Sequence, residues 1–291
     1  MREYLAEEIA LDHSDAILTR REALRRLGLL GLTTSGAAAL LAACGGDGGS
    51  SNQTRKEAAS TTSGAPAGAE AVTFGGPQGE LQGAWAKASD PKGAVLVIHE
   101  NRGLTDHIRS IPPRFARDGY SALAIDLLSE EGGTAAVGGE AEATAALGQA
   151  APERLIADLR AGIDELQRRD RNTELAVIGF CFGGGLTWQL LAAGEPRLAA
   201  AAPFYGPAPA SPDFSGSKAA VLAVYAELDS RVNATRDVAV AALESAGLTH
   251  EVRTFPGVDH AFFNDTGPRY NAAAASEAYQ AVLSWFATHL A

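Results

Sequence analysis

The chain has 291 residues, of which 46% are hydrophobic and 20% charged, and its formal net charge is −11. This composition is typical of a globular protein, and the length suffices for one large domain or two small ones. Because the chain is acidic and has no cluster of Lys and Arg beyond its N-terminus, the sequence argues against binding to nucleic acid.

The first 43 residues indicate an export signal. The stretch around Arg20 and Arg21 resembles a twin-arginine signal, and an apolar run over 27–43 follows it. This run ends in Leu-Ala-Ala before Cys44, which resembles the lipobox of bacterial lipoproteins. An uncleaved membrane anchor is the alternative, although about 17 residues is short for a membrane span. We therefore predict a signal peptide over 1–43 that engages the twin-arginine export machinery.

Lipidation of Cys44 would anchor the mature protein to the outer face of the bacterial cytoplasmic membrane, in the cell envelope. Residues 44–69 are mostly small or polar, which predicts a flexible tether, and 70–291 then form one folded domain. Cys181 is the only other cysteine, so the mature domain would carry one unpaired thiol, which marks it as a candidate reactive group.

The predicted domain alternates strands with helices. An early hairpin over 71–87 is expected to add an antiparallel edge, and 126–153 is a Gly- and Ala-rich region without a predicted element. The expected strands are 93–99, 120–125, 175–179, 198–205, 219–225 and 250–255, and the expected helices are 108–118, 153–169, 235–246 and 271–289. Apolar strands alternating with helices predict an α/β fold, a mostly parallel central sheet with helices on both faces.

The strongest chemical signal is Gly-Phe-Cys-Phe-Gly-Gly at 179–184. It follows a predicted strand and precedes a predicted helix, which is the nucleophile-elbow pattern with Cys181 in place of serine. Glycines beside the nucleophile permit a strained, closely packed turn. The helix N-terminus favours a thiolate and a developing oxyanion. The alternative is a buried structural cysteine before a glycine-rich turn.

A cysteine nucleophile needs a base and a group that orients the base. Asp229 and His260 each follow a predicted strand, and the carboxyl ends of parallel strands form the site in such sheets. Glu227 is a rival to Asp229 at the same turn. Each residue alone could be an ordinary loop residue, but together they give the order Cys181, Asp229, His260, which is that of α/β-hydrolases.

These motifs make residues 93–265 resemble the dienelactone hydrolase family of α/β-hydrolases. The resemblance rests on Ile-His-Glu-Asn-Arg-Gly-Leu at 98–104, His-Ile-Arg at 107–109, Gly-Tyr at 119–120, Ala-Ile-Asp-Leu at 124–127, the cysteine motif at 179–184, Asp229 and Asp-His-Ala-Phe at 259–262.

The resemblance implies a triad of Cys181, His260 and Asp229. It also implies that Glu100 hydrogen-bonds the resting thiol until substrate displaces it, although Glu100 could instead pair with Arg102 or Arg109. The oxyanion hole would be formed by the N–H groups of Phe182 and Asn101.

No cofactor and no metal are expected for such an enzyme. His99, Glu100 and His107 are conceivable metal ligands, but they lack the spacing of a helical zinc motif. Candidate residues for the substrate pocket, which could equally be ordinary core residues, are Tyr205, Trp188, Phe262 and Phe263.

The chain also departs from the family pattern. Members that cleave dienelactone hold its carboxylate with two arginines, one after the second main strand and one shortly after the catalytic histidine. Here 126–153 contains no arginine, and the second position corresponds to Asn264, which is followed by the additional acid Asp265. A buried carboxylate without a cation is costly, so a neutral ester or lactone is expected as substrate.

The predicted function is therefore cysteine-dependent hydrolysis of small esters or lactones through a thioacyl-enzyme. Two alternatives remain open. One is a non-catalytic, ligand-binding envelope lipoprotein with the same fold. The other is an acyltransferase that uses the same triad.

Overall fold

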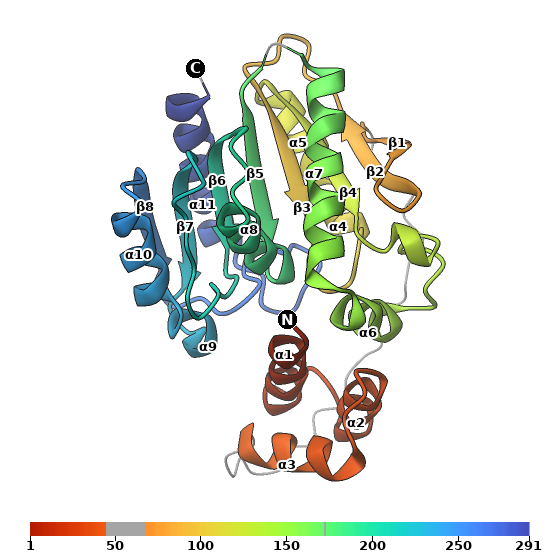
Figure 1. The fold of residues 1–291 in the computed structure, drawn as a ribbon. Coiled ribbons are helices and arrows are strands. Elements are labelled where there is room, and N and C mark those ends of the chain that lie inside the picture. Colours follow the sequence, from red (N-terminus) through yellow and green to blue (C-terminus); the bar gives the residue numbers. More distant parts are fainter. Residues whose placement is uncertain (45–67, 172, 291) are drawn as a thin grey trace.

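A computed structural model describes residues 1–44, 68–171 and 173–290. Within them, one eight-stranded sheet forms the centre of the molecule (Figure 1). In their order across the sheet, the strands are β1 (Glu70–Gly75), β2 (Glu80–Ala86), β4 (Tyr120–Asp126), β3 (Gly93–Ile98), β5 (Leu175–Phe180), β6 (Leu198–Phe204), β7 (Ala220–Ala226) and β8 (His250–Phe255).

The sheet is parallel from β4 through β8, and β1 and β2 form an antiparallel hairpin at one edge. The central strands β3, β4 and β5 are buried along their whole length, as expected for a parallel sheet that is covered on both faces. The predicted α/β fold and the edge hairpin are therefore confirmed.

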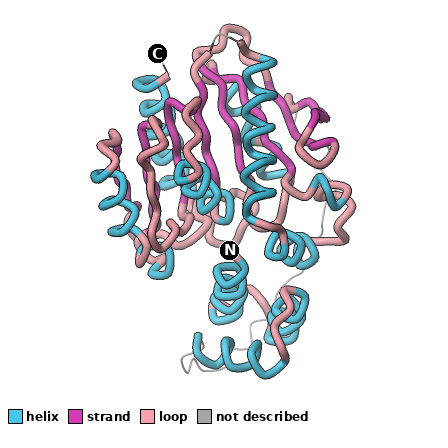
Figure 2. The backbone as a smooth tube through the Cα atoms, viewed as in Figure 1, coloured by secondary structure: helices cyan, strands magenta, loops and turns pink. Residues whose placement is uncertain are grey.

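Helices cover both faces of the sheet, as the tube view shows (Figure 2). The amphipathic helix α7 (Pro152–Arg169) packs with α8 (Phe182–Ala192) on one face, while α5 (Ile111–Arg117) and α11 (Ala272–His289) pack on the other. The remaining domain helices are α4 (Asp106–Arg109), the 3₁₀ turn η1 (Ser129–Glu131), α6 (Glu140–Gln149), α9 (Ser230–Asn233) and α10 (Arg236–Ser245).

Two predicted segments differ from the structure. The helix expected over 108–118 is two helices, α4 and α5, because Ser110 ends the first and the prolines enter the first turn of the second. The region over 126–153, for which no element was predicted, contains η1 and α6.

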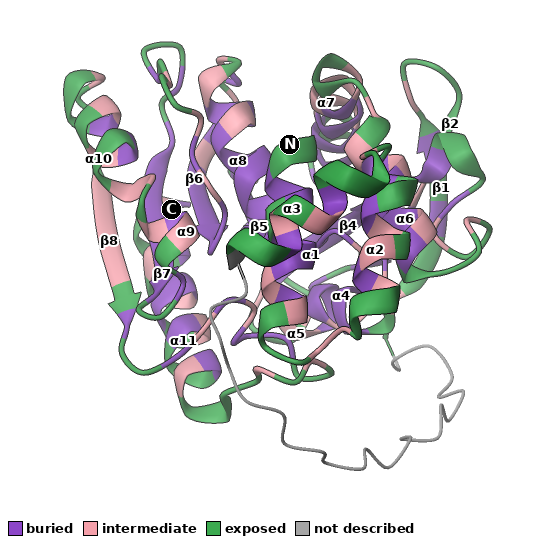
Figure 3. Cartoon of the chain, turned by 90° about the horizontal axis from the view of Figure 1, so that it is seen from below, coloured by how far each residue is buried: buried purple, intermediate pink, exposed green. Residues whose placement is uncertain are grey.

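The N-terminal segment forms three helices, α1 (Arg2–Ser14), α2 (Arg20–Leu29) and α3 (Thr34–Cys44). They lie below the carboxyl ends of the strands, and in the view from below α1 lies across this edge of the sheet (Figure 3). Gln149 Nε2 at the end of α6 donates a hydrogen bond to Leu29 O of α2 at 3.1 Å. The N-terminal helices are therefore packed on the domain rather than separated from it.

The tether predicted over 44–69 lies almost entirely outside the described residues. Among the described residues, no helix has the length and apolar character needed to cross a bilayer.

Candidate active site

Cys181 lies on a strained turn between β5 and α8. Its φ angle is +56°, a left-handed conformation that is uncommon for a residue with a side chain. The neighbouring glycines are required by space, because a Cβ at Gly179 would lie 2.1 Å from Gly183 O. Likewise, a Cβ at Gly183 would lie 2.4 Å from Ile98 O. The local structure is thus that of the predicted elbow, with the thiol at the carboxyl edge of the sheet.

His260 and Asp229 form a short, buried hydrogen bond. Nδ1 of His260 lies 2.6 Å from Oδ2 of Asp229, and Asp229 Oδ1 also accepts from Val232 N at 3.1 Å. The rival Glu227 is exposed and accepts instead from Gly257 N at 2.7 Å. Of the two carboxylates that follow β7, only Asp229 therefore orients the imidazole.

Asp229 and His260 each stabilise the charged form of the other. Burial lowers the pKa of His260, but Asp229 and the Cys181 sulfur raise it by more, so the net pKa lies well above its usual value. Burial raises the pKa of Asp229, and the charge of His260 outweighs this and leaves that pKa below its usual value. A ring nitrogen of His260 lies within 4.8 Å of the Cys181 sulfur. Since Nδ1 is bonded to Asp229, Nε2 is the nitrogen left to face the sulfur.

Of the two residues predicted for the oxyanion hole, Phe182 follows Cys181 directly in sequence and Asn101 lines the same cavity as Cys181. Phe182 is the first residue of α8, so its N–H has no partner inside the helix. Asn101 follows the end of β3 by a few residues, and its side chain is directed at the N-terminal helix, where Nδ2 donates to Glu8 Oε1 at 2.9 Å. The role of their backbone N–H groups as oxyanion donors stays a prediction.

Glu100 does not hold the thiol, contrary to the expectation that the resemblance gave. Its Oε2 accepts a hydrogen bond from Asn264 Nδ2 at 2.6 Å, and no hydrogen bond or ion pair joins it to Arg102 or Arg109 among the described residues. Asn264 replaces the expected arginine and neutralises none of the charge of Glu100, so it holds this carboxylate as a hydrogen-bond donor only.

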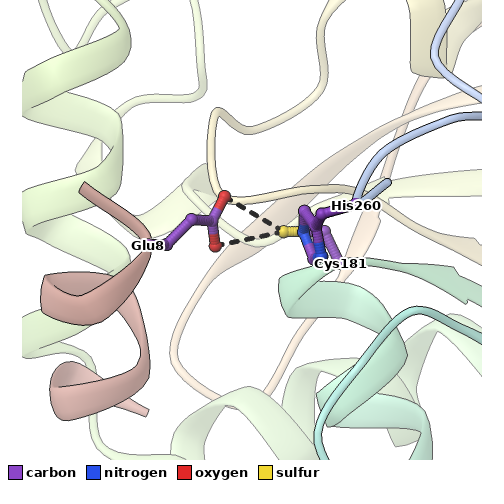
Figure 4. Close-up of side chains that lie close together, drawn as sticks. All are labelled: Glu8, Cys181 and His260. Carbon is purple, nitrogen blue, oxygen red and sulfur yellow. Dashed lines mark hydrogen bonds between the residues drawn. The ribbon is translucent and has the colours of Figure 1, made fainter. Parts of the chain in front are cut away.

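The carboxylate that contacts the thiol is Glu8 of α1. Sγ of Cys181 donates toward Oε1 and Oε2 of Glu8, both at 3.4 Å (Figure 4). The hydroxyl of Tyr4 lies 3.3 Å from the same sulfur. Neither Glu8 nor Tyr4 was predicted from the sequence. The available signal was their spacing, since positions four apart on a helix share a face.

Burial raises the pKa of the Cys181 thiol, and the nearby Glu8 carboxylate raises it further. His260 acts in the opposite direction, and the net pKa remains raised. In this arrangement the sulfur is held as a thiol.

Arginines lie at the site although neither of the two family positions holds one. Arg102 and Arg269 line the cavity at Cys181, and Arg231 lines an adjoining one. They come from the segment after β3, the segment before α11 and helix α9, so the family positions alone did not reveal them. Asp265 faces away from this cavity, where Arg114 Nη2 donates to it at 2.6 Å.

The four predicted pocket aromatics do not line the cavity in this structure. All are at least 97% buried, and they belong to the core behind the site. Tyr205 packs edge-to-face on the His260 ring at a centroid distance of 5.1 Å, and Trp188 donates through Nε1 to Gly206 O. Phe262 and Phe263 pack in the aromatic core, against Phe255 and Phe180 respectively.

His99 and His107 are engaged in structural hydrogen bonds. His99 bonds Glu100 O through Nδ1 and Leu127 N through Nε2, and burial lowers its pKa, which favours the neutral ring. His107 Nδ1 lies 2.7 Å from Asp265 Oδ1. In the part of the chain that the structure describes, the group whose ligand atoms could converge on a metal ion is Glu8, Cys181 and His260.

The domain matches known proteins over most of its length. Residues 81–290 match the dienelactone hydrolase family. A protein of Escherichia coli O157:H7 that is provisionally named a carboxymethylenebutenolidase is 32% identical over 214 residues, which are 69% of this chain and 79% of that relative. A Synechocystis protein with the same provisional name is 32% identical over 213 residues, 67% of this chain and 86% of the relative.

The fold agrees with these sequence matches. The crystal structure of a protein from Klebsiella pneumoniae, provisionally titled a dienelactone hydrolase, superposes with a TM-score of 0.66. It is 27% identical, and the match covers 75% of this chain and 98% of that one. The chain therefore belongs to the dienelactone hydrolase family and is a hydrolase that acts on ester bonds.

Proposed function

We propose that the chain hydrolyses small carboxylic esters or lactones through a thioacyl-enzyme formed on Cys181. The observation that carries this proposal is the buried Asp229–His260 hydrogen bond, at 2.6 Å, next to a cysteine on a nucleophile elbow. Asp229 fixes the imidazole so that Nε2 faces the sulfur.

The reaction has two halves. His260 Nε2 takes the proton of Cys181, the sulfur attacks the substrate carbonyl, and the N–H groups of Phe182 and Asn101 stabilise the oxyanion. The C–O bond of the ester then breaks, and the leaving alkoxide receives the proton from His260. In the second half His260 takes a proton from water, the hydroxide attacks the thioester, and the carboxylic acid leaves as the sulfur regains its proton.

The test is the intact mass of the protein after mixing with p-nitrophenyl acetate. We expect release of nitrophenol together with a transient acetyl adduct on the peptide that contains Cys181, and neither in Cys181→Ala. The measurement is repeated on Glu8→Gln, because the Glu8 carboxylate contacts the sulfur. The same proteins are assayed with a panel of lactones. If neither the parent chain nor Glu8→Gln forms an adduct or exceeds Cys181→Ala in rate with any of these substrates, the proposal is wrong.

We further propose that the mature protein is exported and anchored by a lipid on Cys44. The support is the sequence alone, namely the arginine pair, the apolar run and the Leu-Ala-Ala-Cys motif. Expression in a bacterium fed with labelled palmitate should label the protein and shorten it by 43 residues, and Cys44→Ser should abolish both effects. An unlabelled chain of full length in the membrane fraction would contradict this proposal.

A further inference from the structure

We propose that α1 is an intramolecular inhibitor of this hydrolase, which closes the active site by placing Glu8 and Tyr4 on the Cys181 sulfur. This inference rests on the proposed function, because it assigns a regulatory role to a segment that touches the proposed nucleophile. The chain would turn over substrate only in the fraction of molecules from which α1 has left, so its activity would be low with α1 present and would rise when α1 is removed.

One face of α1 is built for this contact. Tyr4, Glu8 and Asp12 are spaced four residues apart, so they lie one above another on the same side of the helix, and all three are buried. Tyr4 and Glu8 contact the sulfur directly. Leu5 and Ile9 are also buried, next in sequence to these residues, and belong to the hydrophobic core.

The domain supplies partners for each polar group on that face. Arg231 stacks over the Tyr4 ring, with its guanidinium carbon 4.1 Å from the ring centroid, and its Nη2 lies 4.0 Å from Glu8 Oε2. Asn101 donates to the other oxygen of Glu8. The buried carboxylate thus has three neighbours from the domain, the Cys181 thiol, an amide and a guanidinium, which offset the cost of its burial.

A second cation fixes the C-terminal end of α1. Arg269 donates to Asp12 Oδ1 at 3.0 Å, and its other Nη atom pairs with Asp15, directly after the helix. Burial raises the pKa of Asp12 and the nearby Glu8 raises it further, with Arg269 opposing both. The acidic face of α1 therefore matches the arginines at the mouth of the site.

With α1 seated, the cavity at Cys181 has a volume of about 40 Å³, and Glu8 and Asp12 form part of its wall. Sites for small organic ligands usually measure about 300–1,000 Å³. The space that remains accommodates water rather than an ester, so substrate and α1 exclude each other.

The same contact suppresses the chemistry. The Glu8 carboxylate accepts the thiol proton as a hydrogen bond, and its negative charge opposes formation of a thiolate beside it. Glu100, which the family resemblance placed in this role, is bonded to Asn264 instead. In this structure the carboxylate that restrains the nucleophile therefore belongs to α1 and not to the domain.

An inhibitory role of α1 fits the proposed removal of the signal peptide. Cleavage before Cys44 would remove Tyr4 and Glu8 together with the rest of α1. The precursor would then keep its thiol covered, and processing would uncover it.

The test measures alkylation of Cys181 by iodoacetamide in the folded full-length chain, with EDTA present so that no metal ion bridges the sulfur and its neighbours. Digestion and mass spectrometry separate the Cys181 peptide from the Cys44 peptide. The variants are Glu8→Gln alone and together with Tyr4→Ala. The matched control is Glu7→Gln, which changes the same charge on the exposed side of α1.

We expect Cys181 in the double variant to react at least about tenfold faster than in the parent chain, which corresponds to a thiol pKa about one unit lower. The midpoint of the pH–alkylation profile should fall in Glu8→Gln and stay unchanged in Glu7→Gln. Equal rates and equal midpoints in the parent chain and both Glu8 variants would overturn the proposal.

A second variant guards against misfolding. Asp12→Asn with Asp15→Asn leaves the sulfur contacts in place but removes both ion pairs to Arg269, so α1 should open more often and alkylation should rise severalfold. If this variant also reacts like the parent chain, α1 is not an inhibitor.

Alkylation reports access to the thiol and not hydrolysis. Faster alkylation without an acetyl adduct would preserve the role of α1 and refute the proposed reaction, and an active parent chain with unchanged alkylation would do the reverse.

Discussion

At the scale of single residues, two carboxylates that follow β7 have different surroundings. Asp229 is buried and bonded to His260, whereas Glu227 is exposed and bonded to a backbone amide. Both were candidates in the sequence, and only the direction of each side chain separates them.

We expect Asp229→Asn to lower kcat for ester hydrolysis by roughly 10²–10⁴-fold, because an amide neither holds the required tautomer nor stabilises the imidazolium. The matched change Glu227→Gln should leave kcat within about twofold of the parent, since Glu227 lies outside the site. Initial rates measured in a Glu8→Gln background test both. Comparable losses in the two variants would show that Asp229 has no special role.

The site residues that the sequence predicted well are those at the ends of strands. Cys181, Asp229 and His260 follow β5, β7 and β8, and parallel strands bring their carboxyl ends to one edge. Glu8 and Tyr4 could not be found this way, because they contact Cys181 across 173 and 177 residues of sequence. No local pattern specifies a contact between segments so far apart.

At the scale of elements, the strands were predictable and several helices were not, among them α6. Uniformly apolar runs made the strands easy to recognise in the sequence. In contrast, α6 follows an alanine-rich run that contains Gly132, Gly133, Gly138 and Gly139. Its residues are good helix formers, but the glycine-rich sequence before it obscured the signal.

The packing of α8 against β6 gives a prediction for the elbow. A Cβ at Gly184 in α8 would lie 2.4 Å from Phe204 O, and backbone there cannot yield. We expect Gly184→Ala to destabilise the domain by about 3 kcal/mol or more, beyond the usual cost of overpacking. Gly28 in α2 is the control, because it is exposed and a Cβ there meets nothing within 4 Å.

Gly28→Ala should be neutral or stabilising by up to about 1 kcal/mol, because alanine favours the helix over glycine. Urea unfolding of both variants provides the measurement. An equal change in the two would mean that helix propensity, and not the close approach of α8 to β6, decides the outcome.

At the scale of the whole molecule, composition conceals where the charges lie. The chain is acidic overall, yet Arg102, Arg231 and Arg269 gather at the site from three separate segments, and α1 brings acidic residues to meet two of them. The net charge argued against binding to nucleic acid, which is a statement about the average surface. The local arrangement depends on the fold and was not available from the sequence.

Asp265 joins distant parts of the domain. It accepts from Arg114 of α5 and pairs with His107 of α4, more than 150 residues earlier in the chain, and it follows the loop that carries His260. Burial raises the pKa of Asp265, and the bonds from His107 and Arg114 outweigh this and lower it below its usual value. The segment that carries the proposed base is thereby fastened to α4 and α5.

Because the pKa of Asp265 is lower in the folded state than in the unfolded one, its contribution to stability is present above the unfolded pKa of about 3.9. It is lost as the pH falls through the folded pKa.

We expect Asp265→Asn to reduce the free energy of unfolding at pH 7 by about 1 kcal/mol. This is the usual value for a hydrogen bond to a charged group, lowered because the Asp265 side chain is 34% exposed. The difference from the parent chain should shrink as the pH falls below about 4. Urea unfolding from pH 7 to pH 3 measures this, with Asp237→Asn as the control, since that carboxylate is 91% exposed and should change little. A difference for Asp265→Asn that persists unchanged at pH 3 would mean that the shape of the side chain, and not its charge, fastens the loop.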